Sequence, residues 1–455
     1  MGNTRMPATE ELCQAIIQTS FSSLPSPVVD VAKQIILDGI AVAVAGSGED
    51  GPRIVAEHVK SLGGTESSTV LGHGFKTSPV SAAYVNGIAM HVLDYEPMWS
   101  PPTHATSPAL PAVLALAEMM GLPGREVITA FVKGCEVQGR IRLASQQYTP
   151  GRLKYHPPGI VGVMGSAVAA AHLLDLDPSQ LQNALGIAAS RAGGLMANVG
   201  TMTKATHCGW AAMAGLDAAL LARRGFTGNA EIFEAPNGYA DAFFGEGFDF
   251  PALLAFGHSY RMVDPGFAIK LFPSQYATHF GITAALELRS AIGDPHAIRS
   301  VRITTPLMPY VDRPAPRTGL EGKFSFQYTV AAALLDGTVT VQTFSEERRS
   351  RPDMVALLPV ITLVQSDKIP GELEKMWVEI EVELSNGRCV TARCNGPKGF
   401  WGLPRLGREE HLLKIRDCLG MRLGNNETER CIQLVEDLDK LGPDDVRELI
   451  VLAGC

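Results

Sequence analysis

Residues 91–113 read HVLDYEPMWSPPTHATSPALPAV, and this stretch separates two runs of apolar residues that have helical spacing. The run before it contains Tyr84, Val85, Ile88, Ala89 and Val92, and the run after it contains Leu110, Val113, Leu114 and Ala117. Between the runs stand two acidic residues, a tryptophan, a histidine and several prolines. Because proline fixes the backbone, this link is too rigid to be a flexible linker. It predicts a corner between two helices that holds polar side chains in place.

Other helices of the first 230 residues begin at pairs in which a capping residue precedes proline. The pairs are Ser26-Pro27, Ser78-Pro79, Ser107-Pro108 and Asp177-Pro178. In each pair the side-chain oxygen can cap the free N–H groups, and proline suits the first helical position. Glycine and alanine recur at three- and four-residue spacing in GIVGVMGSAVAAAHLL (159–174) and HCGWAAMAGLDAALLA (207–222), and no segment shows a period of two. The pattern predicts tightly packed helices.

The pattern changes after about residue 265. Val301, Ile303 and Thr305 alternate with polar residues, and so do the apolar residues between 378 and 384. Asn386-Gly387 then predicts a tight hairpin into 389–391. Helical patterns at 275–292 and 325–335 lie among these strands, and helix returns from 407. We therefore predict a mainly α protein: a large all-helical domain (1–266 plus 402–455) with an inserted smaller α+β lid domain (267–401).

The composition excludes several classes of protein. The chain has 455 residues, of which 46% are apolar, and its net charge of −8 comes with scattered lysines and arginines, which argues against binding of nucleic acid. Its eight cysteines form no Cys-x-x-Cys pair, and its N-terminus lacks the layout of a signal peptide. The longest apolar run, 160–174, is shorter than the roughly 20 residues of a membrane span. We expect a soluble cytoplasmic protein without a membrane partner.

Familiar catalytic motifs do not explain the chain. The segment GHGFKTS (72–78) lacks the spacing of a phosphate-binding loop, and neither Gly-x-Ser-x-Gly nor the His-Glu-x-x-His spacing of metal ligands occurs. Five polar residues instead stand in apolar or Pro-rich surroundings, most of them where a loop meets a helix: His104, His156, Lys204, Lys270 and Tyr310. Fixed N–H groups and side chains can converge on an anion at such points. Each residue alone also has an ordinary reading, as a structural histidine, a solvated lysine or a tyrosine that ends a strand.

Five blocks of sequence carry a resemblance to a known family. They are AAYVNGIAMHVLDYEPMW with THATSPALPAVLALAE, HPPGIVGVMGSAVAAA, GTMTKATHCGWAAMAG, KLFPSQYATH, and RTGLEGKFSFQY with LLDG. In this order they resemble the MmgE/PrpD family, which includes 2-methylcitrate dehydratase, cis-aconitate decarboxylase and iminodisuccinate epimerase. The likeness covers about residues 10–450 and is greatest to the decarboxylase branch.

The resemblance implies a helical domain with an α+β lid, a cleft between them, a homodimer, and activity without a metal or organic cofactor. It implies two groups of site residues: catalytic Asp94, His104, His156 and Tyr310, and substrate-binding Lys204, Lys270, Met98, Gln275 and His207. Two of these depart from the decarboxylase pattern, because Met98 replaces a threonine and Gln275 replaces a histidine. The segment Asp94-Tyr95-Glu96-Pro97 likewise stands where the decarboxylase has Asp-Phe-Asp-Asp.

The family's chemistry suits these residue types. Its substrates are small polycarboxylates, so Lys204 and Lys270 would each pair with a carboxylate. Dehydration, decarboxylation and epimerisation all develop negative charge beside a carboxylate, which fixed cations stabilise. His104 and His156 would move the proton, Asp94 would orient or charge one of them, and Tyr310 would complete the site from the lid. Decarboxylation of a cis-aconitate-like substrate is our first expectation, followed by dehydration, epimerisation and non-catalytic binding of a carboxylate.

Overall fold

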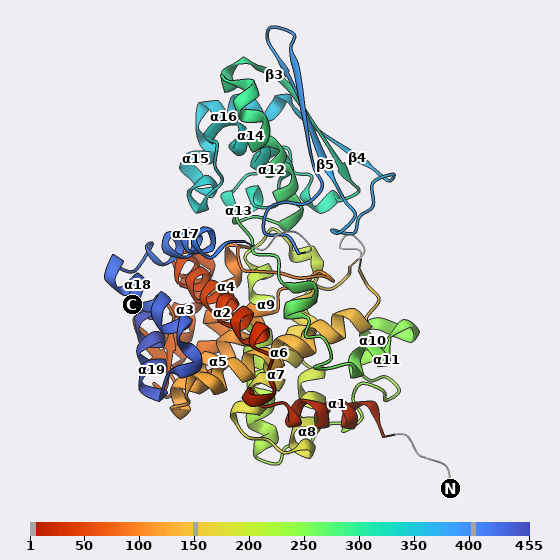
Figure 1. Cartoon of the computed structure of the whole chain (residues 1–455), viewed down its shortest axis with the longest axis vertical. Coiled ribbons are helices and arrows are strands. Elements are labelled where there is room, and N and C mark those ends of the chain that lie inside the picture. Colours follow the sequence, from red (N-terminus) through yellow and green to blue (C-terminus); the bar gives the residue numbers. More distant parts are fainter. Residues whose placement is uncertain (1–5, 149–152, 402–405) are drawn as a thin grey trace.

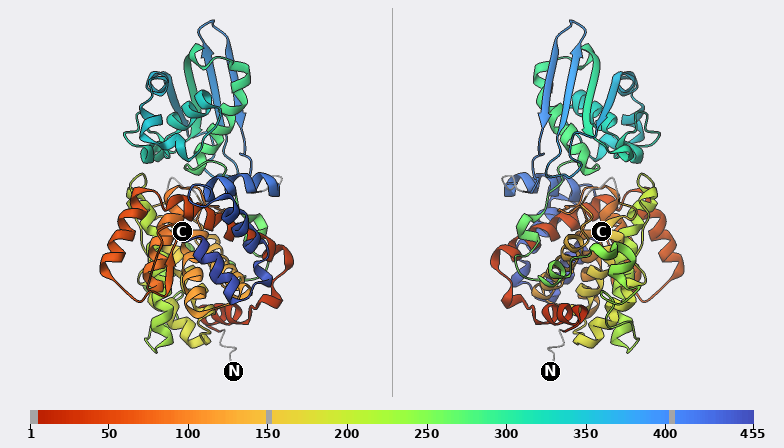
Figure 2. Two further views of the ribbon diagram at one scale, coloured as in Figure 1. Left: turned by 90° about the vertical axis from the view of Figure 1, so that its left-hand side faces the viewer. Right: turned by 90° about the vertical axis from the view of Figure 1, so that its right-hand side faces the viewer.

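The computed structural model describes residues 6–148, 153–401 and 406–455 and is mainly helical. Figures 1 and 2 show two stacked parts, with a helical part that contains both ends of the described chain and a smaller part built around a sheet. The mainly α composition agrees with the sequence prediction. In the part of the chain that is described, no helix has the length and apolar character that crossing a membrane requires. All eight cysteines are free, as their spacing predicted.

The helical part packs around one large hydrophobic core. Its central layer is formed by α7, which lies against α6 and α9, while α9 also packs against α4. Its helices are α1 (Ala8–Gln18), α2 (Ser26–Gly46), α3 (Asp50–Leu62), α4 (Pro79–Val92), α5 (Thr106–Met120), α6 (Gly124–Ala144), α7 (Pro157–Leu173), α8 (Pro178–Ala189), α9 (Thr203–Arg223), α10 (Tyr239–Phe244), α11 (Phe250–Leu254), α17 (Arg408–Leu419), α18 (Asn425–Glu436) and α19 (Pro443–Leu452).

The small residues let helices touch through their backbones, as predicted. A Cβ atom added to Gly209 of α9 would lie 2.4 Å from the carbonyl oxygen of Tyr84 in α4. A Cβ atom on Gly87 would lie 2.7 Å from the Cα atom of Gly209. These contacts bring α9, which carries Lys204, directly against α4, which leads into the Pro-rich corner.

Two of the four predicted caps form. The Ser78 hydroxyl accepts a hydrogen bond from the Ser81 amide (3.2 Å), and the Asp177 carboxylate accepts one from the Gln180 amide (2.8 Å). The predictions for Ser26 and Ser107 are wrong, because both residues lie inside the first turn of their helices. The Ser107 hydroxyl instead donates a hydrogen bond to Glu96 Oε1, 2.9 Å away. A buried carboxylate supplied by the tertiary fold has displaced the local capping interaction.

We predict an all-helical domain for this part of the chain, and that prediction is wrong because the part also contains two short strands. Strands β1 (Ser68–Val70) and β2 (Phe75–Thr77) form a small antiparallel hairpin in which Thr69 faces Lys76. The segment GHGFKTS supplies its turn and second strand, with Gly72 and Gly74 at positive φ. Strands of three residues are too short to show a period of two, which is why the sequence did not reveal them.

The second part is a four-stranded sheet with helices on one face (Figure 1). The strand order is β4-β3-β5-β6, where β3 and β4 run parallel and the other neighbours antiparallel. The elements are α12 (Tyr276–Ile292), β3 (Ile298–Pro306), α13 (Gly319–Gly322), α14 (Phe326–Asp336), α15 (Glu346–Ser350), α16 (Pro352–Leu357), β4 (Ile361–Ser366), β5 (Val378–Leu384) and β6 (Cys389–Cys394). In β5 the apolar residues are buried and the alternating glutamates are not, which confirms the predicted alternation.

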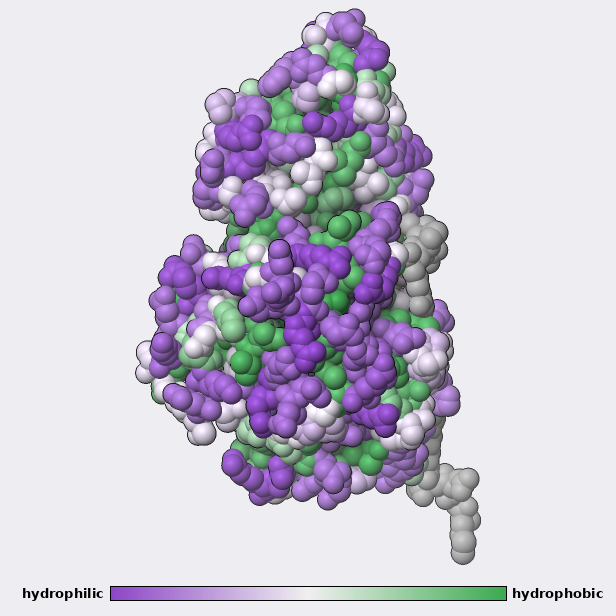
Figure 3. Space-filling model, turned by 60° about the vertical axis from the view of Figure 1, so that its left-hand side comes forward, coloured by the Kyte–Doolittle hydropathy of each residue, from purple (hydrophilic) through white to green (hydrophobic). Residues whose placement is uncertain are grey.

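The two parts have separate hydrophobic cores, and where the parts meet some residues of one chain segment belong to the core of the other part. Met98 and Val199 belong to the core of the sheet part, whereas Ile269 belongs to the core of the helical part. The predicted domain limits therefore fall in a region of mixed packing, and the limit at 401/402 borders residues outside the described part. On the face in Figure 3, hydrophilic residues predominate, and hydrophobic residues also reach the surface where the two parts meet. The limits 1–266 plus 402–455 and 267–401, and the role of the second part as a lid, stay predictions.

Candidate active site

The Pro-rich link between α4 and α5 forms a rigid corner. Trp99 is buried, stacks on Phe267 with ring centroids 4.6 Å apart, and forms an isolated β-bridge with Thr103. Met98 forms a second bridge with Ala268, in the segment that leads to the sheet part. These contacts fix the middle of the corner, and the corner carries Asp94, Glu96 and His104.

A cavity of about 610 Å³, part of it open to solvent, lies beside this corner where the two parts of the molecule meet. Seven of the nine predicted site residues line it: Asp94, Met98, His104, His156, Lys204, Gln275 and Tyr310. Apolar side chains complete the wall, namely Leu153, Met196, Val199, Phe324 and Leu373. Five separate segments of chain therefore bring their polar groups to one place.

Asp94 holds two ammonium groups. Its Oδ2 lies 2.6 Å from Lys204 Nζ, its Oδ1 contacts Lys270 Nζ, and its carbonyl oxygen accepts a hydrogen bond from Lys270 at 2.5 Å. Burial alone would raise the pKa of Asp94, but the two ammonium groups hold it well below its usual value. Burial lowers the pKa of Lys270 to about 8 although Asp94 opposes the shift. Asp94 adopts a positive φ of 50°, which directs its side chain and its carbonyl to the same lysine.

Lys270 and His207 stand one layer behind the cavity wall. Lys270 is completely buried, and Asp94 separates it from the cavity. His207 reaches the site through His156, because their Nδ1 atoms lie 3.2 Å apart. Burial and the charge of Lys204 lower the pKa of His156 well below its usual value, and the same causes lower that of His207 to about 4. Both imidazoles are therefore neutral at pH 7, and one donates a hydrogen bond to the other.

Tyr310 comes from the sheet part and faces these groups. Its hydroxyl accepts a hydrogen bond from Gln275 Nε2 at 3.1 Å. Gln275 in turn caps α12, because its Oε1 accepts from the Ala277 amide at 2.7 Å. Burial and the charge of Asp94 raise the pKa of Tyr310, so the phenol keeps its proton. The Gln275 side chain thus fixes a proton donor at the cavity edge.

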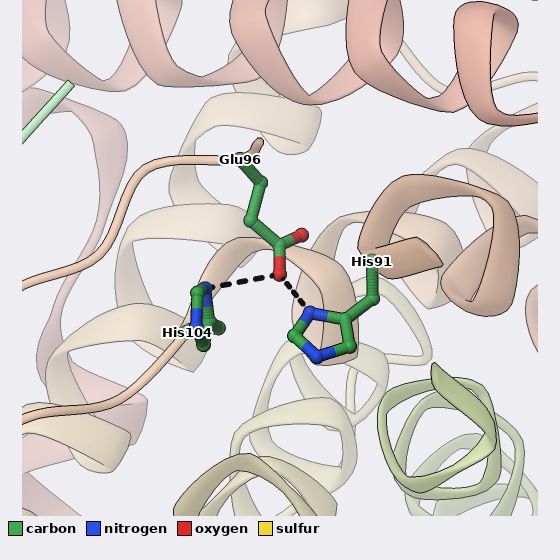
Figure 4. Close-up of side chains that lie close together, drawn as sticks. All are labelled: His91, Glu96 and His104. Atoms are coloured by element: carbon green, nitrogen blue, oxygen red, sulfur yellow. Dashed lines mark hydrogen bonds and ion pairs between the residues drawn. The ribbon is translucent and has the colours of Figure 1, made fainter. Parts of the chain in front are cut away.

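Sequence reasoning gave no role to Glu96, which is fully buried beside His104. Its Oε1 lies 2.5 Å from His91 Nδ1 and 3.2 Å from His104 Nδ1 (Figure 4), and it accepts the Ser107 hydroxyl. The only signal in the sequence was the place of Glu96 two residues after Asp94 in the Pro-rich corner, because a glutamate is seldom fully buried unless it is paired. By contrast, Asp94, which we expected to orient a histidine, comes no closer to His104 than 3.8 Å at Nε2.

His91, Glu96 and His104 are also residue types that bind metals, and their ligand atoms lie within 4.8 Å of one another. Two ligands of a tetrahedral zinc ion lie about 3.4 Å apart, given bonds of about 2.1 Å. The 2.5 Å between His91 Nδ1 and Glu96 Oε1 is instead the separation of a short hydrogen bond. The described geometry favours a hydrogen-bonded array, and the expectation of a metal-free site stays a prediction.

Comparisons with known proteins identify the family to which the chain belongs. Residues 10–251 match the MmgE/PrpD N-terminal domain, and residues 272–440 match the MmgE/PrpD C-terminal domain. The chain is 33% identical to the cis-aconitate decarboxylases of Mus musculus and Homo sapiens, over 95% of its length and 91% and 92% of theirs. It is 24% identical to a mitochondrial 2-methylcitrate dehydratase of Yarrowia lipolytica, over 70% of its length and 65% of that protein. The chain belongs to the MmgE/PrpD family.

Proposed function

We propose that this protein is a cofactor-independent lyase that decarboxylates a small polycarboxylate similar to cis-aconitate. The observation that carries the proposal is the meeting of His104, His156, Lys204 and Tyr310 around one cavity beside Asp94. Similarity to cis-aconitate decarboxylases over nearly the whole chain supports the same reaction.

The proposed reaction separates charge stabilisation from proton transfer. Lys204, held by Asp94, pairs with a carboxylate that stays on the substrate. The bond to the second carboxylate breaks, CO2 leaves, and the electron pair remains on carbon, delocalised toward the first carboxylate. An imidazole, of His104 or His156, takes up a proton from solvent and delivers it to that carbon, which returns the ring to its neutral form. Tyr310 donates a hydrogen bond to the developing negative charge.

The cavity wall favours a second candidate reaction. Met98, Met196 and Leu373 present apolar surface to the same space as Lys204. A tricarboxylate that carries an alkyl group would place that group against this wall. Dehydration of a 2-methylcitrate-type substrate therefore comes second, and it uses the same groups to remove a proton beside a carboxylate. Epimerisation of a dicarboxylate and binding without catalysis remain the third and fourth expectations.

One panel of substrates separates these reactions. The purified protein is incubated with cis-aconitate, 2-methylcitrate and a chiral amino-dicarboxylate, while CO2 release, enoate absorbance and optical rotation are followed. The proposal expects CO2 from cis-aconitate. Enoate from 2-methylcitrate without CO2 assigns the dehydratase reaction, and a change in optical rotation alone assigns the epimerase. Tight calorimetric binding without any product makes the protein a binder and overturns the proposal.

We also propose a cytoplasmic homodimer. Leu195, Met202 and Trp210 expose between 45% and 55% of their surface near the start of α9, close to the segment that bears Lys204. Apolar side chains gathered on a surface are typical of protein contacts. Light scattering coupled to size exclusion is expected to give twice the chain mass of 48.6 kDa. A mass equal to one chain would remove the dimer from the proposal.

A further inference from the structure

We propose that Glu96 is a positioning residue that holds His104 with its proton on Nδ1, so that Nε2 is the atom that exchanges a proton with the substrate. The inference deepens the proposed function and rests on it, because it says which atom of His104 acts. It is carried by the geometry around one carboxylate oxygen, which Figure 4 shows between the two imidazoles.

In the described part of the chain, the polar atoms around His104 have few hydrogen-bond partners. Glu96 and His91 are almost completely buried, and His104 keeps 8% of its surface exposed. Among the residues that the structure describes, His104 Nδ1 has no hydrogen-bond partner. The Oε1 atom of Glu96 lies 3.2 Å from it, a contact between a carboxylate and an imidazole whose angle is not that of a formed hydrogen bond. Because an unsatisfied buried N–H group is unfavourable, the proton of Nδ1 belongs to this contact. Hydrogen bonds of catalytic groups often become linear only when a substrate is bound.

The two nitrogen atoms of His104 lie near different carboxylates. Burial lowers the pKa of this imidazole well below its usual value, so at neutral pH it carries one proton. If the proton were on Nε2, its nearest carboxylate would be Asp94 Oδ1, 3.8 Å away. That distance is too long for a hydrogen bond, and the oxygen is already occupied by Lys270. The proton is therefore better placed on Nδ1, which leaves the lone pair of Nε2 on the side of Asp94 and the cavity.

The neutral ring of His104 must gain a proton before it can give one to carbon. Nε2 accepts this proton from solvent, since the cavity is partly open, and becomes the second N–H of an imidazolium ion while Nδ1 keeps its own proton. Giving the Nε2 proton to substrate carbon restores the neutral ring. Burial raises the pKa of the Glu96 carboxyl well above its usual value, while the hydrogen bond from Ser107 lowers it. In its ionised form Glu96 accepts the Nδ1 proton's hydrogen bond and stabilises the imidazolium, and His91 contacts the same oxygen. In serine proteases an aspartate plays this part for a histidine, and its amide variant loses about 10⁴-fold in kcat because the tautomer is wrong.

Nuclear magnetic resonance tests the tautomer without any substrate. In protein labelled with 15N-histidine, the His104 signals are assigned by their loss in His104→Gln. We expect a protonated Nδ1 and a bare Nε2 in the wild-type protein at neutral pH, and a mixture of tautomers in Glu96→Gln. A wild-type His104 protonated on Nε2, or a tautomer unchanged by Glu96→Gln, would overturn the inference. If Glu96→Gln fails to fold, the wild-type spectrum alone decides.

Kinetics provide the second readout. Glu96→Gln is expected to lower kcat at least about 100-fold with little change in KM, and Glu96→Asp is expected to recover part of the loss because it keeps a carboxylate. Glu118→Gln is the matched control, since Glu118 is also buried but binds the β1–β2 hairpin through Thr69. Its activity should equal that of the wild type. Full activity in Glu96→Gln, with His104→Gln inactive, would refute the inference and leave the proposed function intact.

Discussion

The exchange Asp94→Asn removes one negative charge from between two buried ammonium groups. Asparagine has almost the same size, and it tolerates the left-handed conformation that residue 94 adopts at φ 50°. Any loss of stability therefore reports on charge and not on backbone strain. Lys204 and Lys270 would keep their positions but lose the carboxylate that both contact.

The size of the effect follows from the structure. At the 2.6 Å between Asp94 and Lys204, the attraction at an effective dielectric constant of 20 is about 6 kcal/mol before desolvation. Removing one partner of a buried ion pair typically destabilises a protein by about 3–5 kcal/mol. The pKa of Lys270, about 8 in the wild type, falls further without Asp94. Lys270 then loses its proton near neutral pH, which keeps the total loss within this range.

The sign of the pH dependence can be derived from the same pKa. A free lysine titrates near 10.5, so between the lowered folded pKa and 10.5 the unfolded chain binds the extra proton. Stability therefore rises with pH in this window. In Asp94→Asn the pKa of Lys270 is lower than about 8, so the pH range over which this variant gains stability begins at lower pH than in the wild type. The difference in stability between the two proteins should then be larger at pH 7 than at pH 9.

Urea unfolding at pH 7 and pH 9 tests this reasoning. The free energy of unfolding of Asp94→Asn should be lower than that of the wild type by about 3–5 kcal/mol at pH 7 and by less at pH 9. Asp217→Asn is the control, because its partner Arg191 and Asp217 itself are both partly exposed, and its loss should stay below about 1 kcal/mol. An Asp94→Asn protein with wild-type stability at both pH values would refute the view that Asp94 balances both lysines.

Three further substitutions test other parts of the account. Tyr310→Phe removes the hydroxyl that accepts a hydrogen bond from Gln275. The kcat should fall at least about tenfold while the Tm stays unchanged. An unaltered kcat would show that the Tyr310 hydroxyl has no part in the reaction. Lys323→Met replaces a buried ammonium group, and burial lowers the pKa of Lys323 to about 8. The free energy of unfolding should therefore rise by up to about 3 kcal/mol at pH 7 and by less at pH 10. An equal gain at both pH values would contradict this. Gly209→Ala forces a Cβ atom against the Tyr84 carbonyl and should destabilise the protein by about 1–3 kcal/mol, whereas Gly193→Ala, which has open space, should have little effect by calorimetry.

Local sequence signals predicted the main helices and the strands β3, β5 and β6, but they did not reveal β4. Ser78-Pro79 and Asp177-Pro178 begin helices as expected, because capping and the fixed φ of proline act within one turn. The alternation of Val378, Ile380 and Val382 identified a strand because one face of the sheet is buried. The β1–β2 hairpin escaped prediction because strands of three residues carry no readable period.

The arrangement within the site could not be derived from local signals. The resemblance implies that Lys270 binds substrate, but in the structure Lys270 lies behind Asp94. This position depends on contacts between residues that are 176 positions apart in the sequence. Ser107 looks like a cap, yet its hydroxyl binds Glu96. The part played by Glu96 likewise depends on two histidines that only the folded corner brings to one oxygen. Such pairings are decided by tertiary packing.

Deuterium transfer to carbon shows whether His104 and His156 carry the proton. The protein is incubated in D2O with cis-aconitate and with 2-methylcitrate, and the carbon-bound hydrogens of products and remaining substrate are analysed by mass spectrometry. An imidazole that exchanges protons with substrate carbon predicts one deuterium per decarboxylated product, and a large fall in the rate of labelled product in His104→Gln or His156→Gln. Products without carbon-bound deuterium, or labelled product formed at the wild-type rate in both variants, would show that these histidines do not carry the proton.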